Sequence, residues 1–502
     1  MRGVVSAAAG LWLFPIAAAG CAGLGLSWVT ALVAGALVAG AAAWVAGGRL
    51  AAILAPALTG SRAAALLVAL LAAGCTLQLG RLAVFMVDAN RMAFSIRPND
   101  PFFREHCCFS AYAEAARFTL EGGNVYDERR YVPPGRPGER PPGRYIGTLR
   151  VDPYHYPPPF LLLPRALRPA APAFHQMRAL WFALQVLVFA GAVVVIAGWL
   201  GGPAGAWTLA GGLLVLLLPT TAFGLQQGNF QMTATPLALG SLALLAGGRQ
   251  APGALGLAYA ALSKIFPGVL VVMLVAARRW RAAAWTAGAG VLLLVLTVGV
   301  LGPQPFRDFV GYELPLIADG RAFPQTERPQ VVPSNLSMYG LTVKLRLLGV
   351  EALDQRTGLL LTSVYGLLVL AIAAWAGWRV PWTDTTTAGR LRLLQLALAL
   401  LGLASFRSPF VGAAYGMTST LWLLTLLAAG AGSGRTRGAW LLGAVALSLV
   451  VLWLPTPSQA VWTSGIVLSV VVFLAALAVN AWCAISVGLR RGERVTDLPE
   501  AA

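Results

Sequence analysis

The residues whose side chains could do chemistry are concentrated in one polar window, residues 88–157. The window contains the run NDPFFREHCCFSAYAEAARF and, after a segment rich in Pro and Arg, the run DPYHYPPPF. Carboxylates, histidines, thiols and tyrosines therefore lie close together in the chain. On both sides of the window the sequence is a series of apolar stretches. We interpret the window as a large loop at which the protein meets water and can do chemistry.

The composition predicts a membrane protein. Hydrophobic residues make up 58% of the 502 residues, charged residues make up 11%, and the mean hydropathy is +0.72. A soluble domain has about 25% charged residues. Every backbone amide in lipid must be paired internally, which leaves helices or a closed barrel. The apolar stretches are rich in Leu, Ala, Val and Gly and do not alternate, so we predict an all-α polytopic membrane protein.

The basic residues are distributed like those of cytoplasmic loops. The net charge is +18, but the arginines stand at the ends of apolar stretches and form no compact basic domain. This pattern argues against nucleic acid and favours anionic membrane lipids as partners. Residues 88–157 differ, because their ten Arg and nine acidic residues leave a charge of only +1. A long loop near neutrality is translocated despite its arginines, so we expect it outside the cytoplasm.

About twelve membrane helices are expected, each of ~20 residues. Residues 3–47 are long enough for two spans, and residues 157–167 suit a short or broken helix. Residues 253–277 have basic residues at both ends and Pro267 in the middle, so we expect a hairpin that enters the membrane and returns. An amphipathic, interfacial helix is expected over residues 340–350. The other spans are expected near 63–87, 179–200, 205–223, 230–247, 283–301, 358–378, 393–405, 410–430, 438–454 and 460–487.

The cysteines and histidines form no metal motif in the sequence. Cys107 and Cys108 are adjacent, and adjacent cysteines rarely pair. The run from Glu105 to Cys108 has metal-ligand types without the spacing of a zinc site. We therefore expect no metal and no other cofactor. The remaining cysteines, expected to be packing residues in apolar stretches, are Cys21, Cys75 and Cys483.

Several short motifs in a fixed order carry a resemblance to a known family. The motifs are Ser110-Ala-Tyr112-Ala-Glu114-Ala-Ala with Gly122-Gly-Asn124-Val-Tyr126, Tyr154-His155-Tyr156-Pro157-Pro158, Gln226-Gln227-Gly228-Asn229-Phe230, Ser263-Lys264-Ile-Phe-Pro267, Asn335-Leu-Ser337 with Gly340, and Ser408-Pro409. With them the chain resembles the family-87 glycosyltransferases, whose best-known members are polyprenyl-phosphate-mannose-dependent mannosyltransferases of the GT-C fold. The resemblance covers residues 63–430.

The resemblance implies a GT-C-like bundle with a large first extracytoplasmic loop. We expect its segments to be an N-terminal transmembrane hairpin (1–60), a first core helix (61–87), the extracytoplasmic catalytic loop (88–157), core transmembrane helices (158–301), a second extracytoplasmic loop with an interfacial helix (302–350), C-terminal transmembrane helices (351–489) and a cytoplasmic tail (490–502).

The resemblance also implies an activity. It is the transfer of a sugar, most simply mannose, from a polyprenyl-phosphate donor to a hydroxyl of a glycan or lipid acceptor. The site would lie on the extracytoplasmic face of the cell membrane, and the transfer would be a direct displacement with a carboxylate base. No nucleotide takes part, and the chain has neither a GxGxxG motif nor a P-loop.

One departure from the family concerns the general base. The family pattern implies an aspartate shortly before the Tyr112 motif, where this chain has Cys108. A carboxylate must take the acceptor proton as the new bond forms, so Asp100 and Glu105 become the catalytic candidates. The alternative is that both are solvated loop acids paired with neighbouring arginines. The acids next in line are Asp127 and Asp152.

Three cationic or imidazole side chains are candidates for binding the donor phosphate. Lys264 is a lone lysine in an apolar run, where a charge should face an anion or a cavity; snorkelling to an interface is the alternative. His155 stands where the loop re-enters the membrane, and anchoring in an interfacial aromatic belt is its alternative. Arg407 interrupts an apolar stretch, which indicates an anion or an internal carboxylate partner.

A further set of aromatic and amide side chains could bind sugar hydroxyls. For the two asparagines, helix capping is the alternative. These candidates are Tyr112, Tyr126, Tyr154, Tyr156, Gln227, Asn229 and Asn335.

Two other functions stay open at this point. A transporter or flippase for a lipid-linked saccharide would require charged residues through the helical midplane, where we find only Lys264 and Arg407. A non-catalytic membrane subunit is favoured by Cys108, since it replaces the expected base.

Overall fold

The computed structural model describes residues 2–58, 62–132, 144–380, 382 and 384–489. The expected tail, 490–502, and the Pro/Arg-rich segment 133–143 lie outside these residues. The described chain is a helical bundle with one small sheet. The expectation of an all-α polytopic membrane protein is confirmed.

Seven helices of the described chain are long and apolar enough to cross a membrane. The helices α8 (Gly202–Leu217) and α9 (Pro219–Gln227) meet at a bend of 63° and make an eighth span if they are taken together. The sequence-based count of about twelve is reached only by including shorter apolar helices. The seven are α3 (Arg62–Val87), α7 (Phe174–Leu200), α13 (Trp280–Leu301), α17 (Gln355–Arg379), α18 (Thr387–Ser405), α21 (Gly434–Leu452) and α22 (Thr463–Leu489).

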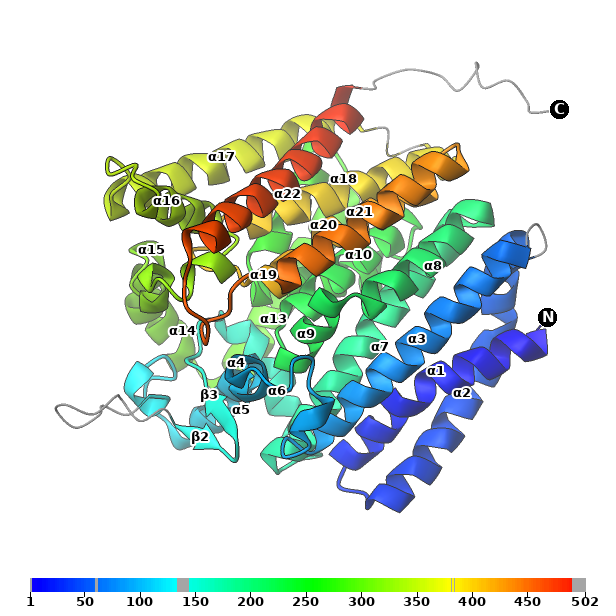
Figure 1. Cartoon of the computed structure of the whole chain (residues 1–502), viewed down its shortest axis with the longest axis horizontal. Coiled ribbons are helices and arrows are strands. Elements are labelled where there is room, and N and C mark those ends of the chain that lie inside the picture. The colour runs from blue at the N-terminus through cyan, green and yellow to red at the C-terminus, as the bar shows by residue number, and fades with distance from the viewer. Residues whose placement is uncertain (1, 59–61, 133–143, 381, 383, 490–502) are drawn as a thin grey trace.

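The N-terminal hairpin lies at one edge of the bundle. Its helices α1 (Arg2–Gly23) and α2 (Trp28–Leu58) pack on each other, and α1 also packs on α3 and α7 (Figure 1). A Cβ at Gly23 would lie 2.8 Å from the backbone nitrogen of Leu180, so a glycine is required for this close approach. The hairpin thus packs against the outer side of α3 and α7.

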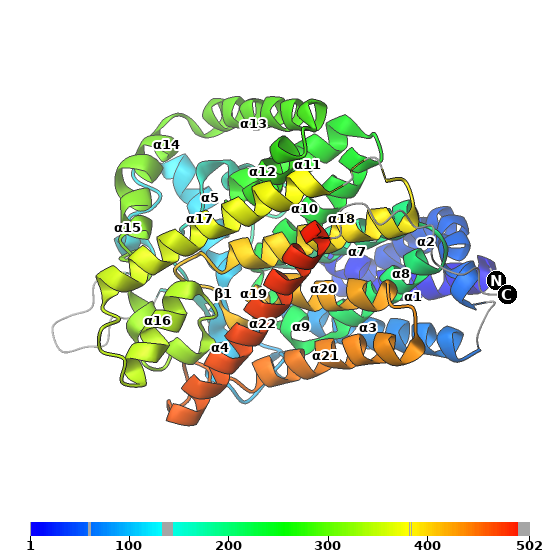
Figure 2. The same ribbon diagram turned by 90° about the horizontal axis from the view of Figure 1, so that it is seen from above.

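The segment 253–277 consists of two helices joined by a turn at Pro267, and we call it the α11–α12 hairpin. Helix α11 (Gln250–Ser263) is followed by Lys264, a 3₁₀ turn η4 (Phe266–Gly268) and the short helix α12 (Val269–Ala276). Pro267 stands in the first turn of η4, where its missing N–H costs nothing. Figure 2 shows α11 and α12 beside α13 at one edge of the bundle, and both helices contact α13. The turn of the hairpin places Lys264 inside the assembly.

The large loop 88–157 folds over one end of the bundle (Figure 1). It contains α4 (Pro101–Glu105), β1 (His106–Cys107), α5 (Cys108–Glu121), β2 (Tyr145–Ile146) and β3 (Leu149–Val151), and the sheet order is β1-β3-β2. Strand β1 is parallel to β3, with His106 opposite Arg150 and Cys107 opposite Val151. This register places Cys108, which follows β1, and Asp152, which follows β3, at the same end of the sheet.

The second loop is also structured. It contains α14 (Gln304–Asp308), a π-helical turn η5 (Phe309–Glu313), α15 (Leu314–Ala318), the turns η6 (Pro324–Glu327) and η7 (Val332–Ser334), and α16 (Met338–Leu347). The expected amphipathic helix is α16, but residues 339–344 are buried and pack against α17. Its N-cap is Ser337, whose side chain accepts a hydrogen bond from Gly340.

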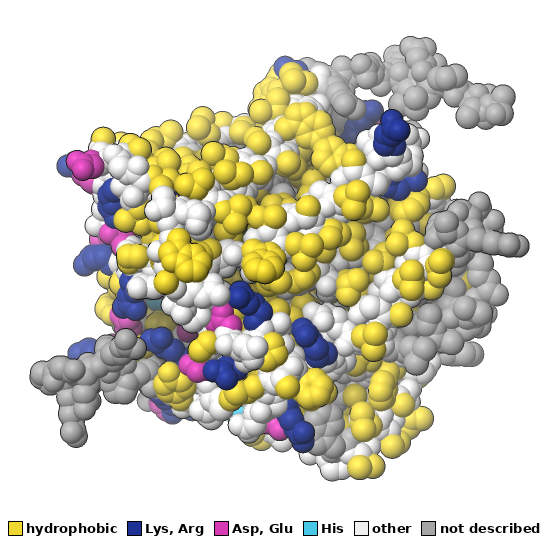
Figure 3. All heavy atoms as spheres, in the orientation of Figure 1, with side chains coloured by type: hydrophobic (Ala, Val, Ile, Leu, Met, Phe, Trp, Pro, Cys, Tyr) yellow, Lys and Arg dark blue, Asp and Glu magenta, His cyan; other side chains and the backbone are white. Residues whose placement is uncertain are grey.

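The remaining helices complete the bundle around the hairpin. They are η3 (Pro158–Leu161) with α6 (Leu162–Leu167), which form the expected short helix, and α10 (Gln231–Ala246), α19 (Ala413–Gly416) and α20 (Thr418–Ala429). Figure 3 shows hydrophobic side chains over the long helices and charged side chains gathered toward the two ends of the bundle. An apolar belt between polar ends is the surface of a protein that spans a bilayer.

The two ends of the bundle should label from opposite sides of the membrane. Glu128 in the large loop and Arg435 at the start of α21 are both exposed. We predict that Glu128→Cys reacts with a membrane-impermeant maleimide in intact cells, whereas Arg435→Cys reacts only after lysis, with the parent protein as the blank. The reverse pattern would contradict the assignment of residues 88–157 to the outside.

Candidate active site

Three polar side chains meet at the end of the small sheet. The Nδ1 atom of His106 lies 3.3 Å from a carboxylate oxygen of Asp152, and its Nε2 atom lies 3.5 Å from Sγ of Cys108. Ser110 fixes this end of the sheet, because its hydroxyl accepts a hydrogen bond from the Asp152 N–H at 3.0 Å. Phe102 stacks on the imidazole with ring centroids 4.7 Å apart. The side chains of His106, Cys108 and Asp152 are all partly exposed.

The break between α9 and α10 supplies the next polar group, Asn229. Gly228 ends α9 with φ at +69°, a left-handed conformation that favours glycine. The indole of Trp181 donates to the Gly228 carbonyl at 2.9 Å, and the amide of Gln185 donates to the Asn229 carbonyl at 2.8 Å. The Asn229 side chain accepts from the N–H of Gln231, the first residue of α10, at 3.0 Å, although the N-cap of this helix is Phe230. The break is thus held by hydrogen bonds inside the bundle.

The hairpin tip brings Lys264 to the same place. Its ammonium donates to Oδ1 of Asn229 at 3.1 Å and lies 5.4 Å and 5.3 Å from the ring centroids of Tyr156 and Tyr415. The other side-chain atom of Asn229, Nδ2, donates to Sγ of Cys108 at 3.4 Å. No carboxylate of the described residues lies within 4.0 Å of the lysine, since no ion pair includes it.

These contacts join five side chains into one hydrogen-bonded row, which we call the polar row: Asp152, His106, Cys108, Asn229 and Lys264. One end is acidic and the other is cationic. Burial alone would lower the pKa of His106, but the charge of Asp152, the neighbouring Cys108 sulfur and the hydrogen bonds to both raise this pKa well above its usual value. The sheet, the α9–α10 break and the α11–α12 hairpin each contribute part of the row.

The tyrosines proposed to bind sugar form an aromatic cluster beside the polar row. The hydroxyl of Tyr112 donates to that of Tyr156 at 2.9 Å, and Tyr126 donates to the Tyr156 carbonyl at 2.9 Å. Tyr154 donates to the carbonyl of Pro157 at 3.1 Å. Tyr112, Tyr126 and Tyr154 are buried, whereas Tyr156 is partly exposed. Tyr156 is therefore the member of this group that can meet a ligand directly.

The two acids first considered as the base lie outside the polar row. Asp100 is the N-cap of α4, accepting from the N–H of Phe102, and it also accepts from the hydroxyls of Thr456 and Ser458 at 2.8 Å and 2.6 Å. These contacts tie the large loop to the segment before α22. Glu105 is partly exposed and makes no side-chain hydrogen bond or ion pair within the described chain.

The other predicted site residues are spread over the same end of the bundle. His155 pairs with the buried Glu313 at 2.8 Å, and its ring lies beside Phe323. Arg407 is exposed, and a Cβ at Gly366 would touch its side chain. Among the described residues no acid pairs with Arg407, so the internal carboxylate partner considered for it is not found.

Two predicted amide side chains are buried. Gln227 is 2% exposed, and its side-chain oxygen has no hydrogen-bond partner. Asn335 donates to the Pro409 carbonyl at 3.1 Å and accepts from the Val411 N–H at 3.0 Å. These bonds hold the start of α16 against the loop that follows α18. The alternative that Asn335 caps this helix is wrong, because the cap is Ser337.

The ligand atoms of His106, Cys108 and Asp152 lie within 4.8 Å of one another, although spacing in the sequence predicted no metal site. Their closest contacts, however, use different ring nitrogens: the carboxylate faces Nδ1 and the sulfur faces Nε2. A histidine ligates one ion through one nitrogen. The same three side chains could also hold one ion, with the imidazole contributing one ring nitrogen.

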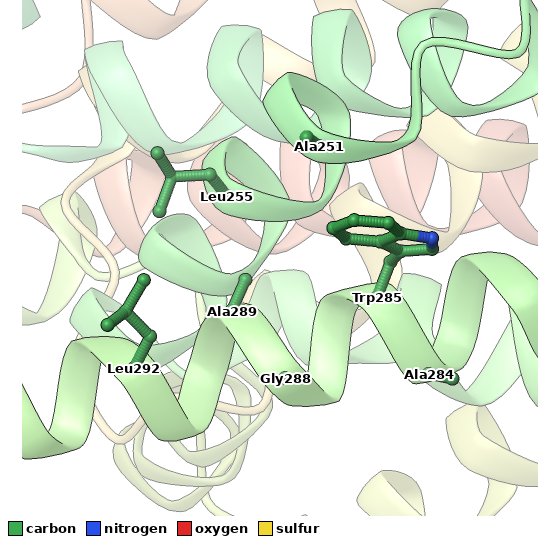
Figure 4. Close-up of a pocket in the computed structure, with 7 residues that line it drawn as sticks. All are labelled: Ala251, Leu255, Ala284, Trp285, Gly288, Ala289 and Leu292. Carbon is green, nitrogen blue, oxygen red and sulfur yellow. The ribbon is translucent and has the colours of Figure 1, made fainter.

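An apolar groove runs between α11 and α13 (Figure 4). Its volume is about 530 Å³. Leu255, Trp285 and Leu292, which line it, are 46%, 48% and 53% exposed. The groove therefore opens onto the apolar belt, on the outer side of the hairpin that carries Lys264.

Comparison with known proteins gives one match. A family model described as Glycosyltransferase family 87 matches residues 154–405. No curated protein and no solved structure matches the chain. The matched range includes Asn229, Lys264 and the hairpin, and it begins just after Asp152.

The conformation of Gly228 should be essential to the site. A Cβ there would lie 2.8 Å from the Cβ of Phe109, so Gly228→Ala combines left-handed strain of about 1–2 kcal/mol with overpacking of about 1–3 kcal/mol. Gly248, with φ at +85° and nothing within 4 Å of its Cβ position, provides the control. We predict that Gly228→Ala lowers the thermal unfolding temperature clearly more than Gly248→Ala. Equal losses would mean that close packing at the break is unimportant.

Proposed function

The chain belongs to glycosyltransferase family 87, and we propose that it transfers mannose from a polyprenyl-phosphate donor to an acceptor hydroxyl at the outer face of the cell membrane. That the protein is a membrane glycosyltransferase follows from the family and from its apolar helices. The donor, the sugar, the side of the membrane and the roles of individual residues are the proposal.

The observation that carries the proposal is the environment of Lys264. Its ammonium is partly buried, is bound by a neutral amide and lies near two tyrosine rings. A charge in such a place is costly unless an anion joins it. The described residues provide no carboxylate within 4.0 Å of Lys264, and a phosphate would supply the missing counter-charge. If the phosphate of the donor binds there, its sugar would lie along the rest of the polar row.

The acidic end of the polar row suits the acceptor. Asp152 has one carboxylate oxygen on His106, and its side chain is 24% exposed. As the bond between the anomeric carbon and the phosphate oxygen breaks, a bond to the acceptor oxygen must form and the acceptor must lose its proton. Asp152, positioned by His106, is the carboxylate of the polar row and takes over the role first considered for Asp100 and Glu105.

The groove between α11 and α13 supports a lipid-linked donor. It is apolar, and α11 leads directly to Lys264 at the hairpin tip. A prenyl chain in or near this groove would stay in the bilayer while its phosphate reaches the polar row. A transporter or a non-catalytic subunit is disfavoured, because the family is one of transferases.

Loss of the charge at Lys264 should weaken donor binding. We predict that Lys264→Met raises the dissociation constant for a short-chain polyprenyl-phosphate mannose by an amount equal to about 1.5–3 kcal/mol, the range for a hydrogen bond to a charged group. Lys264→Arg, which keeps the charge, should retain more of the affinity. The measurement is equilibrium binding to the purified protein. Unchanged affinity in Lys264→Met would mean that the donor phosphate does not bind at Lys264.

The three candidate carboxylates can be separated by kinetics. We predict that Asp152→Asn lowers the turnover number by ~10²–10⁴ and leaves donor binding intact. Asp100→Asn should mainly lower thermal stability, because Asp100 caps α4 and binds Thr456 and Ser458. Glu105→Gln should change neither quantity strongly. Normal turnover in Asp152→Asn with a large loss in Glu105→Gln would assign the base to Glu105.

A further inference from the structure

The end of the small sheet gathers three different types of metal ligand, namely an imidazole, a thiol and a carboxylate. One ligand atom each from His106, Cys108 and Asp152 lies within 4.8 Å of the other two. Among the described residues this is the one group of three or more such side chains with that property. The fold therefore adds Asp152 to a histidine and a cysteine that the sequence already places together.

The spacing of the three ligand atoms is close to that around a tetrahedral zinc ion. At the usual bond lengths, the ligand atoms of such an ion lie roughly 3.3–3.6 Å apart. The contacts of His106 with Asp152 and with Cys108, at 3.3 Å and 3.5 Å, have this spacing, although they use different ring nitrogens. For one nitrogen to serve both partners, the widest pair must approach by about 1 Å. Rotation about a Cα–Cβ bond moves a sulfur or a carboxylate oxygen by more than this, so the backbone can stay in place.

The backbone and the neighbouring side chains hold the ligands in position. The Ser110 hydroxyl accepts from the Asp152 N–H at 3.0 Å and donates to the Cys107 carbonyl at 2.6 Å. It thus ties the end of β3 to the end of β1. The Asn229 amide donates to the Cys108 sulfur at 3.4 Å. Outer hydrogen bonds of this kind orient the ligands of metal sites and tune their affinity.

The donor types and charges favour zinc over the common hard cations. Imidazole and thiolate select zinc and other thiophilic ions, whereas magnesium and calcium prefer oxygen ligands. A thiolate and a carboxylate together balance the two charges of the ion. Three protein ligands leave the fourth position of a tetrahedral ion to water. The side chains of His106 and Asp152 are each 24% exposed, and Cys108 is partly exposed, so an ion from the surrounding water can reach all three.

We propose that His106, Cys108 and Asp152 bind a zinc ion and that the bound ion stops sugar transfer. A carboxylate bound to zinc is a much weaker base, whereas the direct displacement needs Asp152 free to take the acceptor proton. Zinc binding follows from the geometry of the three side chains, and the inhibition rests on the proposed function. The ion is thus no cofactor of the reaction, and it sets how many chains can carry the reaction out.

Zinc binding is measured first, without any substrate. The untagged full chain in lipid nanodiscs, kept reduced and freed of metal with a chelator, is titrated with zinc against a chromophoric indicator. We expect one zinc ion per chain and no displacement by magnesium or calcium. Cobalt in place of zinc should give a sulfur-to-cobalt charge-transfer absorption and the visible bands of a four-coordinate ion.

Two cysteine variants and one carboxylate variant assign the ligands. Cys108→Ala and Asp152→Asn should each weaken zinc binding by at least ~10–100-fold, the range for loss of an outer-shell partner alone. Cys107→Ala removes a thiol that is 0% exposed, so it should bind one zinc ion with the affinity of the wild type. The sulfur-to-cobalt band should persist in Cys107→Ala and vanish in Cys108→Ala. Thermal unfolding without metal checks that each variant folds.

Turnover then tests the inhibition. Transfer from short-chain polyprenyl-phosphate mannose by the wild type and by Cys107→Ala should fall in parallel with the zinc occupancy found in the titration. A chelator should restore the rate, which separates metal binding from oxidation of the thiol. Cys108→Ala, compared with its own rate without metal, should keep most of that rate at a zinc concentration that saturates the wild type.

The zinc site is overturned if the wild type shows no saturable zinc binding, or if Cys108→Ala binds zinc as tightly as the wild type. The inhibition is overturned if saturating zinc leaves turnover unchanged, or if a chelator lowers the turnover of the purified protein. If the wild type consumes no polyprenyl-phosphate sugar with any acceptor offered, the proposed function fails and the inhibition fails with it. The titration and the cobalt spectrum decide the zinc site in either case, because they need no turnover.

Discussion

The hydrogen bond between Lys264 and Asn229 is the interaction on which the rest of the site depends. It places an ammonium in an apolar bundle against a neutral amide, with no carboxylate of the described chain within 4.0 Å. Removing a charge from water is costly without a counter-charge. Charged side chains in membrane helices pair with other polar groups and often mark a substrate or ion site. Lys264 has no counter-charge within the described chain, and a lipid-linked phosphate would supply one.

The polar row exists because helices are broken inside the bundle. In lipid, irregular backbone is tolerated only where other protein groups satisfy its amides. Gly228 and Asn229 meet this condition through Trp181 and Gln185, whose side chains bind the two carbonyls. The tip of the α11–α12 hairpin lies at the same level, so the side chain of Lys264 contacts that of Asn229. The same hydrogen bonds therefore satisfy the backbone and hold the site in place.

Much of the fold could be predicted from the sequence, because long apolar stretches and basic flanks have direct physical meaning. The hairpin at Pro267, the short helix after Pro157 and the long spans follow from hydropathy and proline chemistry. The assembly of the polar row could not be predicted in this way. Asp152 meets His106 only through the parallel pairing of β1 with β3, and strands of two and three residues leave no periodic pattern. Lys264 and Asn229 were identified as candidates, but their mutual contact depends on tertiary packing. Cys108 was noticed only as a missing carboxylate, and its contacts with His106 and Asn229 also depend on tertiary packing.

The central claim is that a sugar phosphate binds along the polar row with its phosphate at Lys264. The most direct measurement is an electron cryomicroscopy map of the full chain in a nanodisc with a non-transferable polyprenyl-phosphonate mannose analogue. The account predicts phosphonate density against the Lys264 ammonium, sugar density toward Cys108 and the prenyl chain leaving toward the apolar belt beside α11. Well-ordered analogue density elsewhere, with the Lys264–Asn229 contact unchanged and unoccupied, would contradict it.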